Sequence, residues 1–166
     1  MPDPAAPLIV QSDRTILLEV DNPSFERCRD ALMGFADLVK SPEHFHTYRI
    51  TPLSLWNARA AGWSVDDMLA TLDRHSKFPV PGNVIADIRD YAARFGRLTL
   101  QRADDGLLLE AADEPLAAEL WNHKQSRALL AEQLDERRFR VRLLDRGNLK
   151  QALIKLGFPV EDLAGY

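Results

Sequence analysis

The sequence has a single cysteine among its 166 residues, Cys28, which excludes an intrachain disulfide and a zinc site built on several cysteines. Cys28 falls among apolar residues with helical spacing, where a lone cysteine is usually a small core residue. A cysteine nucleophile is conceivable at this position alone. We expect Cys28 to be buried, which argues against that chemistry.

Long hydrophobic runs and targeting signals are missing as well. No apolar run approaches the roughly 20 residues that a membrane-spanning helix needs. The opening Met-Pro-Asp-Pro has neither the basic nor the apolar region of a signal peptide. We therefore expect a cytoplasmic protein with no membrane partner. Its hydrophobic content of 46% and charged fraction of 28% are typical of a globular chain of one compact domain or two small ones.

The motifs of nucleotide hydrolysis and nucleophilic catalysis are also absent. There is no GxxxxGK[ST] phosphate loop, no GxGxxG after a strand, no Asp-Glu pair after an apolar strand and no GxSxG elbow. His44 and His46 would share one face of a strand, but a zinc site needs three or four ligands and nothing nearby completes it. We predict no catalytic residues, no metal ligands and no cofactor in this chain.

Acidic residues outnumber basic ones overall, but the basic residues are concentrated near the C-terminus. The formal net charge is −4, and phosphate neutralisation relies on clustered lysine and arginine, so any DNA contact must be local. The acidic residues of the C-terminal stretch are mainly Asp135, Glu136 and Asp145. Its basic residues are Arg137, Arg138, Arg140, Arg142, Arg146, Lys150 and Lys155. This stretch is the first candidate for a DNA contact.

The first part of the chain predicts strands and one helix. Residues 1–7, rich in proline and alanine, are expected to be a disordered leader. β-favouring runs at 8–11 and 15–20 predict a hairpin, and 45–51 predicts a third strand. Apolar residues at helical spacing predict an amphipathic helix over 25–40.

Residues 52–112 predict three short helices followed by a β-hairpin. Gly62 and Gly96 close two of the helices, and Asp104-Asp105-Gly106 is a strong hairpin-turn signal. Because this is the element order of a winged-helix module, we interpret 52–112 as a helical, winged-helix-like insertion with a hairpin.

The rest of the chain predicts short helices and one more strand. Residues 113–134 form a helical connection, 138–143 alternates basic and apolar residues as a strand does, and a last helix ends at Gly157. We expect the 138–143 strand to join the N-terminal hairpin, so that 8–51 and 135–158 make one core. The predicted fold class is α+β, a small mixed or antiparallel sheet with packed helices.

The 138–143 strand is the strongest candidate for contacting DNA. Arg138, Arg140 and Arg142 share one face, where their guanidinium groups reach successive phosphates. The following helix would extend this track through Arg146, Lys150 and Lys155. The alternative is a solvated or partner-facing edge strand, whose charge is needed to block aggregation.

The winged-helix interpretation adds further candidates. Arg89 and Arg94 lie on the helix that would enter a groove, and Arg97 and Arg102 lie on the wing, although acidic residues on that helix weaken the idea. Trp56 and Trp121 fall on apolar helical faces and are predicted to pack in the core. Trp63 stays open between core packing and stacking on a base.

One stretch resembles a known family. His46 to Gly62, with the run Tyr-Arg-Ile-Thr-Pro-Leu-Ser-Leu-Trp-Asn-Ala, resembles the signature of the N-terminal domain of bacterial XPB-type DNA repair helicases. Residues 7–20 are similar to the family's opening hairpin, 91–98 to its middle, and 150–166 to the junction before the first motor lobe. The resemblance spans nearly the whole chain after the leader.

The resemblance implies a parent protein that is a superfamily 2, ATP-dependent 3′ to 5′ DNA helicase or translocase of nucleotide excision repair. This chain would be an accessory domain without catalytic activity, with ATP and Mg²⁺ in the parent motor and 159–166 as the linker to it. Archaeal relatives carry a smaller domain that resembles the mismatch-sensing domain of MutS. The helices inserted over 52–95 depart from that pattern and put a damage-sensing role in doubt.

Two functions follow from these observations. In the first, the domain engages DNA, as forked or damaged duplex, and regulates the helicase lobes of the same chain. In the second, it is a protein-interaction or structural domain that packs on those lobes or on a nuclease without touching DNA, as the acidic net charge suggests. DNA binding near physiological salt discriminates between the two.

Overall fold

The structure is a computed structural model that describes residues 2–104 and 106–165. It folds as two compact units, of which the first ends at Ala92 and the second begins at Ala93. Each unit has its own sheet and its own hydrophobic core. Helices and sheets occur in both, which confirms the predicted α+β class.

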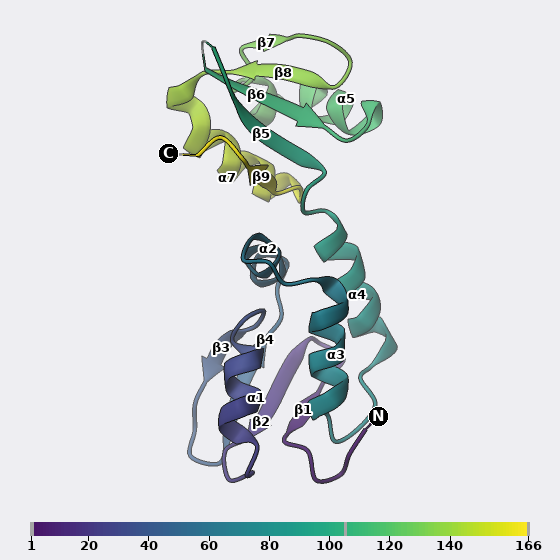
Figure 1. Cartoon of the computed structure of the whole chain (residues 1–166). Coiled ribbons are helices and arrows are strands. Elements are labelled where there is room, and N and C mark those ends of the chain that lie inside the picture. Colours follow the sequence, from purple (N-terminus) through teal and green to yellow (C-terminus); the bar gives the residue numbers. More distant parts are fainter. Residues whose placement is uncertain (1, 105, 166) are drawn as a thin grey trace. The chain divides into compact units, whose positions relative to one another are not determined.

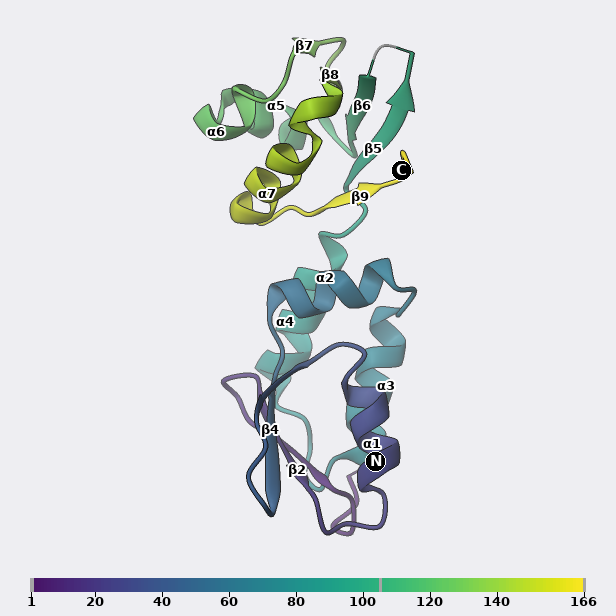
Figure 2. The ribbon, with the colours of Figure 1, turned by 90° about the vertical axis from the view of Figure 1, so that its left-hand side faces the viewer.

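The first unit is a four-stranded antiparallel sheet with helices packed on it. Its strands are β1 (Leu8–Val10), β2 (Thr15–Glu19), β3 (Asp37–Lys40) and β4 (Phe45–Arg49), in the order β1-β2-β4-β3. Its helices are α1 (Phe25–Leu32), α2 (Pro52–Ala60), α3 (Val65–His75) and all but the last residue of α4 (Gly82–Ala93). Helices α1 and α3 lie on the same side of the sheet (Figures 1 and 2).

Side-chain alternation determines which face of this sheet is covered. Ile16, Leu18 and Tyr48 point to one face and are buried together with Cys28 and Leu32 of α1. Burial raises the pKa of the Cys28 thiol to about 12, because an apolar environment disfavours the thiolate. The prediction of a buried cysteine is confirmed.

Local capping sets where α2 and α3 begin. The Thr51 hydroxyl accepts a hydrogen bond from the Ser54 amide, and the Ser54 hydroxyl accepts one from the Thr51 amide, which makes a capping box. Ser64 caps α3, since its hydroxyl accepts a hydrogen bond from the Asp67 amide at 3.0 Å. Gly62 has φ 105°, the left-handed conformation expected after α2.

The second unit is a five-stranded sheet with helices on one face. Its strands are β5 (Leu98–Ala103), β6 (Gly106–Ala111), β7 (Glu132–Gln133), β8 (Arg138–Val141) and β9 (Val160–Asp162), in the order β7-β8-β6-β5-β9. Its helices are α5 (Glu114–Asn122), α6 (Lys124–Arg127) and α7 (Arg146–Leu156), preceded by a 3₁₀ turn at Leu143–Asp145. β9 runs parallel to β5, and the other pairs are antiparallel.

The inner face of the second sheet packs against α5 and α7. Phe139 and Val141 of β8 stand opposite Leu109 and Leu107 of β6 in the strand register. All four side chains are fully buried in the core to which α5 and α7 also contribute. β8 is therefore held on one face by apolar contacts, which turns its other residues outward.

The predicted helix over 25–40 is wrong in its second half. α1 ends at Leu32, and Asp37–Lys40 forms strand β3 on the edge of the first sheet. Gly34 weakens the helix because glycine loses the most conformational freedom on folding. β4 in turn offers backbone groups that need hydrogen-bond partners. Tertiary pairing thus overrides the helical spacing of the apolar residues.

The predicted sheet membership is also wrong. The Arg138 strand lies beside β6 in the second sheet, so 8–51 and 135–158 do not share a sheet. The hairpin assigned to the 52–112 insertion also belongs to the second unit. Strand patterns reveal which face is buried but not which strand is the neighbour. The winged-helix arrangement stays a prediction.

The chain segments expected to be a leader and a linker carry structure. The Asp3 amide donates to the Ser76 carbonyl at 3.0 Å, and Ala6 is buried. Within 159–166, the residues Val160–Asp162 form β9. The predicted hairpin turn joins β5 to β6, with Asp105 outside the described residues.

Gly34 is a position where the first unit has no room for a side chain. A Cβ built there lies 2.5 to 2.6 Å from three ring atoms of Trp63. The same indole packs against Phe35, with ring centroids 5.2 Å apart. The Trp63 ring therefore packs directly on the backbone of Gly34, where a side chain would not fit.

We predict that Gly34→Ala lowers the free energy of unfolding by about 1–3 kcal/mol, because the methyl group overpacks the contact with Trp63. Urea denaturation followed by tryptophan fluorescence measures the change. Gly82→Ala is the matched control, since nothing lies within 4 Å of a Cβ at that position. Equal midpoints for the two variants would contradict the tight packing of Trp63.

A single carboxylate ties β9 to α7. Asp162 accepts hydrogen bonds from Arg146 at 2.7 and 2.8 Å and from Lys150 at 3.1 Å. Burial alone would raise the pKa of this carboxyl, but the bonds from Arg146, the Ala164 amide and Lys150 outweigh it. They hold the pKa below its usual range.

We predict that Asp162→Asn lowers the free energy of unfolding by about 2 kcal/mol at neutral pH, because two cations lose a charged acceptor. Since the folded pKa is depressed, Asp162 stabilises the fold above its unfolded pKa of roughly 4. That contribution is lost as pH falls through the folded pKa. Urea denaturation between pH 3 and 7 should therefore show the difference shrinking towards acid. Glu161→Gln is the neighbouring control, and an equal loss at pH 3 and 7 would refute the ionic origin.

Candidate nucleic-acid interface

β8 presents the basic face predicted from the sequence. Arg138 and Arg140 are exposed on this strand, whereas the alternating Phe139 and Val141 are buried. Arg142 follows the strand with its side chain 63% exposed. The structure thus brings the three predicted arginines to the surface of the second unit.

Each of these guanidinium groups has a carboxylate partner. The pairs are Arg138 with Asp135 at 2.6 Å, Arg140 with Glu132 at 3.8 Å and Arg142 with Asp145 at 2.8 Å. The Arg137 amide and the Arg138 side chain hold the pKa of the Asp135 carboxyl below its usual range. A phosphate that approaches this face competes with carboxylates already in place.

The predicted track on α7 is only partly available. Arg146 is 9% exposed, and it shares Asp162 with Lys150. Both residues hold β9 against α7. Lys155, by contrast, is exposed near the end of the helix.

Arg94, Arg97 and Arg102 contact the second unit itself. The guanidinium groups of Arg94 and Arg97 lie 5.4 and 5.7 Å from the ring centroid of Phe158. Arg97 also pairs at 2.5 Å with Asp113, the N-cap of α5. Arg102 donates to two backbone carbonyls of the C-terminal segment, each at 3.4 Å. These contacts stabilise the ends of the β5–β6 hairpin.

Arg89 is in the first unit. It borders a hollow of about 440 Å³ that α3 and α4 line with Leu69, Asp73, Ile85 and their neighbours. Other polar residues of the predicted groove helix are engaged inside this unit. Asn83 donates to the Ser12 carbonyl at 2.7 Å, and Asp87 pairs with Arg14 at 3.0 Å.

A basic pair on α6 was not predicted from the sequence. The guanidinium carbon of Arg127 lies 3.6 Å from the ring centroid of Trp121, and Lys124 begins the same short helix. Neither cation pairs with a carboxylate among the described residues. A Trp-x-x-Lys-x-x-Arg spacing was the available signal, and it is weak because it does not place the arginine on the ring.

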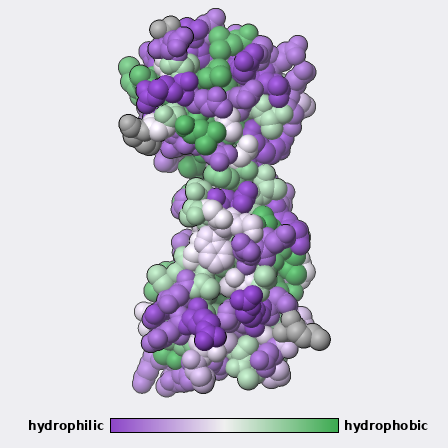
Figure 3. All heavy atoms as spheres, in the orientation of Figure 1, coloured by the Kyte–Doolittle hydropathy of each residue, from purple (hydrophilic) through white to green (hydrophobic). Residues whose placement is uncertain are grey.

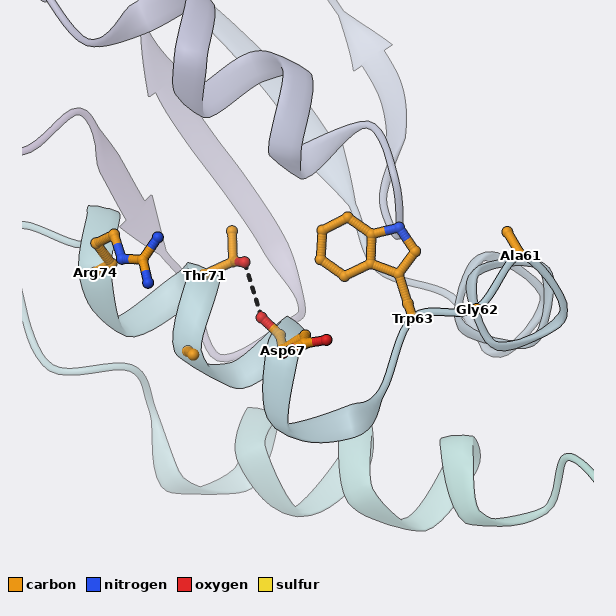
Figure 4. Close-up of a pocket in the computed structure, with 7 residues that line it drawn as sticks. Ala61, Gly62, Trp63, Asp67, Thr71 and Arg74 are labelled. Carbon is orange, nitrogen blue, oxygen red and sulfur yellow. Dashed lines mark hydrogen bonds between the residues drawn. The ribbon is translucent and has the colours of Figure 1, made fainter.

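The three tryptophans have different surroundings. Trp56 is buried and donates to the Tyr91 carbonyl at 2.8 Å, which confirms its place in the core. Trp121 is half-buried on Phe139. Trp63 borders a hollow of about 430 Å³, where it faces Asp67, Thr71 and Arg74 of α3 (Figure 4). Trp63 thus packs against the core and also lines this surface hollow.

The two candidate histidines have separate partners. The Nδ1 atom of His44 lies 3.1 Å from the Asp21 carboxylate, and the His46 ring meets Phe25 edge-on with centroids 5.3 Å apart. Within residues 2–104 and 106–165, no group of three or more histidine, cysteine or acidic side chains is placed to hold a metal ion. No helix in the described part of the chain is long and apolar enough to cross a membrane.

Comparison with known proteins identifies close relatives. A DNA 3′-5′ helicase XPB of Kineococcus radiotolerans is 47% identical over 161 residues, which are 96% of this chain and 29% of that protein. A protein of the same name from Mycobacterium tuberculosis is 45% identical over 161 residues, with the same shares of 96% and 29%. A general transcription and DNA repair factor IIH helicase/translocase subunit XPB of Antonospora locustae is 36% identical over 106 residues, 64% of this chain and 15% of that protein. The chain spans less than a third of the length of these relatives.

These matches confirm the likeness to XPB-type helicases that residues 46–62 indicated. A family model matches residues 8–135, and its family is described as a helicase conserved C-terminal domain. The prediction of an N-terminal domain is corrected by this description. The chain belongs to the helicase conserved C-terminal domain family.

Proposed function

We propose that this chain is a DNA-engaging, motor-regulating module of an XPB-type 3′ to 5′ DNA helicase of nucleotide excision repair. The observation that carries the proposal is the outward-facing pair Arg138 and Arg140 on β8, continued by Arg142. The partners are forked or damaged duplex DNA and the helicase lobes of the parent protein, with a nuclease as a further candidate. The module itself has no catalytic activity.

The spacing of the arginines suits a phosphate backbone. Alternate residues of a strand are about 6.6–6.8 Å apart, so Arg138 and Arg140 reach different phosphates of one nucleic-acid strand. Charge-assisted hydrogen bonds to phosphate are roughly twice as strong as neutral ones. Lys155 would extend this contact. Arg146, Lys150, Arg89, Arg94, Arg97 and Arg102 are secondary candidates, because most of them are engaged within their own unit.

The carboxylates beside the arginines would compete with phosphate for the guanidinium groups. The pairs Arg138–Asp135 and Arg140–Glu132 are exposed, so exchanging either carboxylate for a phosphate costs little, whereas Asp145 is buried. Asp135 and Glu132 lie in the segment around β7, and Asp145 precedes α7. DNA that displaces Asp135 and Glu132 from the arginines would free the segment around β7. This is a physical route by which the geometry of the DNA would affect neighbouring helicase lobes.

In this proposal the chain does not bind nucleotide itself. The sequence lacks the phosphate loop that binds ATP, and the described residues hold no group of three acidic, histidine or cysteine side chains suited to a metal ion. These residues do not fit an ATP–magnesium site. We assign ATP and Mg²⁺ to the motor of the parent helicase.

The proposal predicts that the variant Arg138→Ala, Arg140→Ala, Arg142→Ala binds forked DNA at least about tenfold more weakly than the wild type, because three phosphate contacts are lost. Its plot of log affinity against log salt should be shallower by about 2 to 3. Fluorescence anisotropy with labelled forked DNA at several salt concentrations measures both.

A control variant removes the same charge elsewhere. Arg27, Lys40 and Arg49 are exposed in the first unit, and their replacement by alanine leaves β8 intact. We expect a change below about twofold for this control, as a remote charge acts only through the screened long-range field. Equal losses in both triple variants would exclude β8 as the contact.

A second candidate function is a protein-interaction or structural domain that packs on the helicase lobes or a nuclease without touching DNA. The observation that favours it is a pair of apolar side chains directly after Arg142, since Leu143 is 52% and Leu144 is 77% exposed. Hydrophobic residues also lie among hydrophilic ones on the face of each unit drawn in Figure 3. Exposed apolar groups beside charge are typical of contact surfaces.

This second function predicts that Leu143→Ser with Leu144→Ser weakens association with the helicase lobes by about tenfold or more, since two buried leucines would be lost from the interface. Isothermal titration calorimetry of the chain against the lobes measures the effect. DNA affinity should stay unchanged in this variant. Tight association with the lobes, together with no DNA binding by the wild type, would favour this function over the first.

A further inference from the structure

We infer that Arg127, stacked on Trp121, forms with Lys124 a second binding site for the phosphate groups of a nucleic-acid backbone. This inference rests on the proposed function and deepens it, because it adds a contact that lies outside the β8 arginines. Its starting observation is the position of the Arg127 guanidinium, 3.6 Å from the centroid of the Trp121 ring.

The stack is anchored in the core of the second unit. Phe139 of β8 is fully buried, and Trp121 lies nearly parallel to it, with centroids 5.7 Å and planes 19° apart. Trp121 is half-buried and Arg127 is exposed. From core to surface, the order is therefore Phe139, Trp121, Arg127, so a rigid base supports a charged group at the surface.

The turn between α5 and α6 fixes the arginine further. Ser126 is fully buried, and its hydroxyl donates to the Leu120 carbonyl at 2.5 Å. One guanidinium nitrogen of Arg127 donates to the Trp121 carbonyl at 3.4 Å. A side chain held in this way loses less rotamer freedom when it binds an anion, so more of the interaction appears as affinity.

The local charge also suits an anion. Arg127 and Lys124 are three positions apart on α6, which places them on the same side of the helix. Neither pairs with a carboxylate in the described ranges, whereas Arg138, Arg140 and Arg142 each do. An incoming phosphate here displaces water rather than a bound carboxylate.

The chemistry favours a nucleic-acid phosphate over an acidic peptide. A guanidinium fork matches both phosphate and carboxylate, but an arginine held on a ring beside a second cation is typical of nucleic-acid recognition. Strand β8 takes part in both sites, through residues on its two opposite faces. Its outer face carries Arg138 and Arg140, and its inner face supports the Trp121 stack through Phe139.

The test measures binding of fluorescein-labelled single-stranded and forked DNA to the whole chain by anisotropy at low salt. We expect Arg127→Ala to weaken binding about fivefold to tenfold, and Arg127→Lys about threefold, because lysine keeps the charge but loses the planar fork. Lys124→Ala should cost about twofold to threefold through one lost phosphate contact. Arg27→Ala, a surface arginine of the first unit, is the control and should change affinity by less than about twofold.

The possible results separate failure of the α6 site from failure of the proposed function. If the wild type binds DNA and Arg127→Ala behaves like Arg27→Ala, the α6 site is excluded and the proposed function stands. If the wild type binds no DNA, the proposed function fails and the inference fails with it. A hexaglutamate peptide that binds as tightly as DNA, and is lost in Arg127→Ala, would overturn the assignment to nucleic acid. Thermal unfolding of the Arg127→Lys variant checks that the fold is retained.

Discussion

The burial of one face of β8 is the constraint on which both proposed contacts depend. Phe139 and Val141 stand opposite Leu109 and Leu107, and all four are inaccessible to solvent. Because side chains of a strand alternate, this register turns Arg138 outward and gives Trp121 a ring to lie on. A slip of one residue would bury the arginines and expose the core, so the register is strongly specified.

Charge in this molecule is organised locally rather than globally. The chain is acidic overall, yet it gathers basic residues on β8 and on α6. The two groups differ in their neighbours, since the β8 arginines are matched with carboxylates and Arg127 rests on an aromatic ring. In the proposed contacts, a phosphate would have to displace a carboxylate at the first group. At the second group it would meet a guanidinium already held on a ring.

The relatives of this chain are much longer proteins, the XPB helicases. The chain covers less than a third of the relatives that it matches over nearly its whole length. Its residues offer surface charge and packing but no nucleotide-binding loop. The proposed role, a module whose DNA binding would serve a motor elsewhere in the parent protein, builds on this partial likeness.

Local features of the fold were largely predictable from the sequence. The hairpin at β1 and β2, the serine cap of α3, the left-handed glycines after α2 and α7 and the burial of Cys28 follow from short-range preferences and apolar spacing. The alternation of arginines on β8 belongs to the same class, because it needs only the period of a strand. The likeness to XPB-type helicases was also readable from one stretch of residues, whereas its assignment to an N-terminal domain was wrong.

Tertiary structure alone decided what those elements touch. It converted Asp37–Lys40 into a strand, moved the Arg138 strand into the second sheet and placed Asp135 and Asp145 on the arginines. It also laid Arg127 on Trp121. The physical reason is range: propensities, caps and alternation act between near neighbours, whereas strand pairing and ring stacking depend on which distant residues share a core.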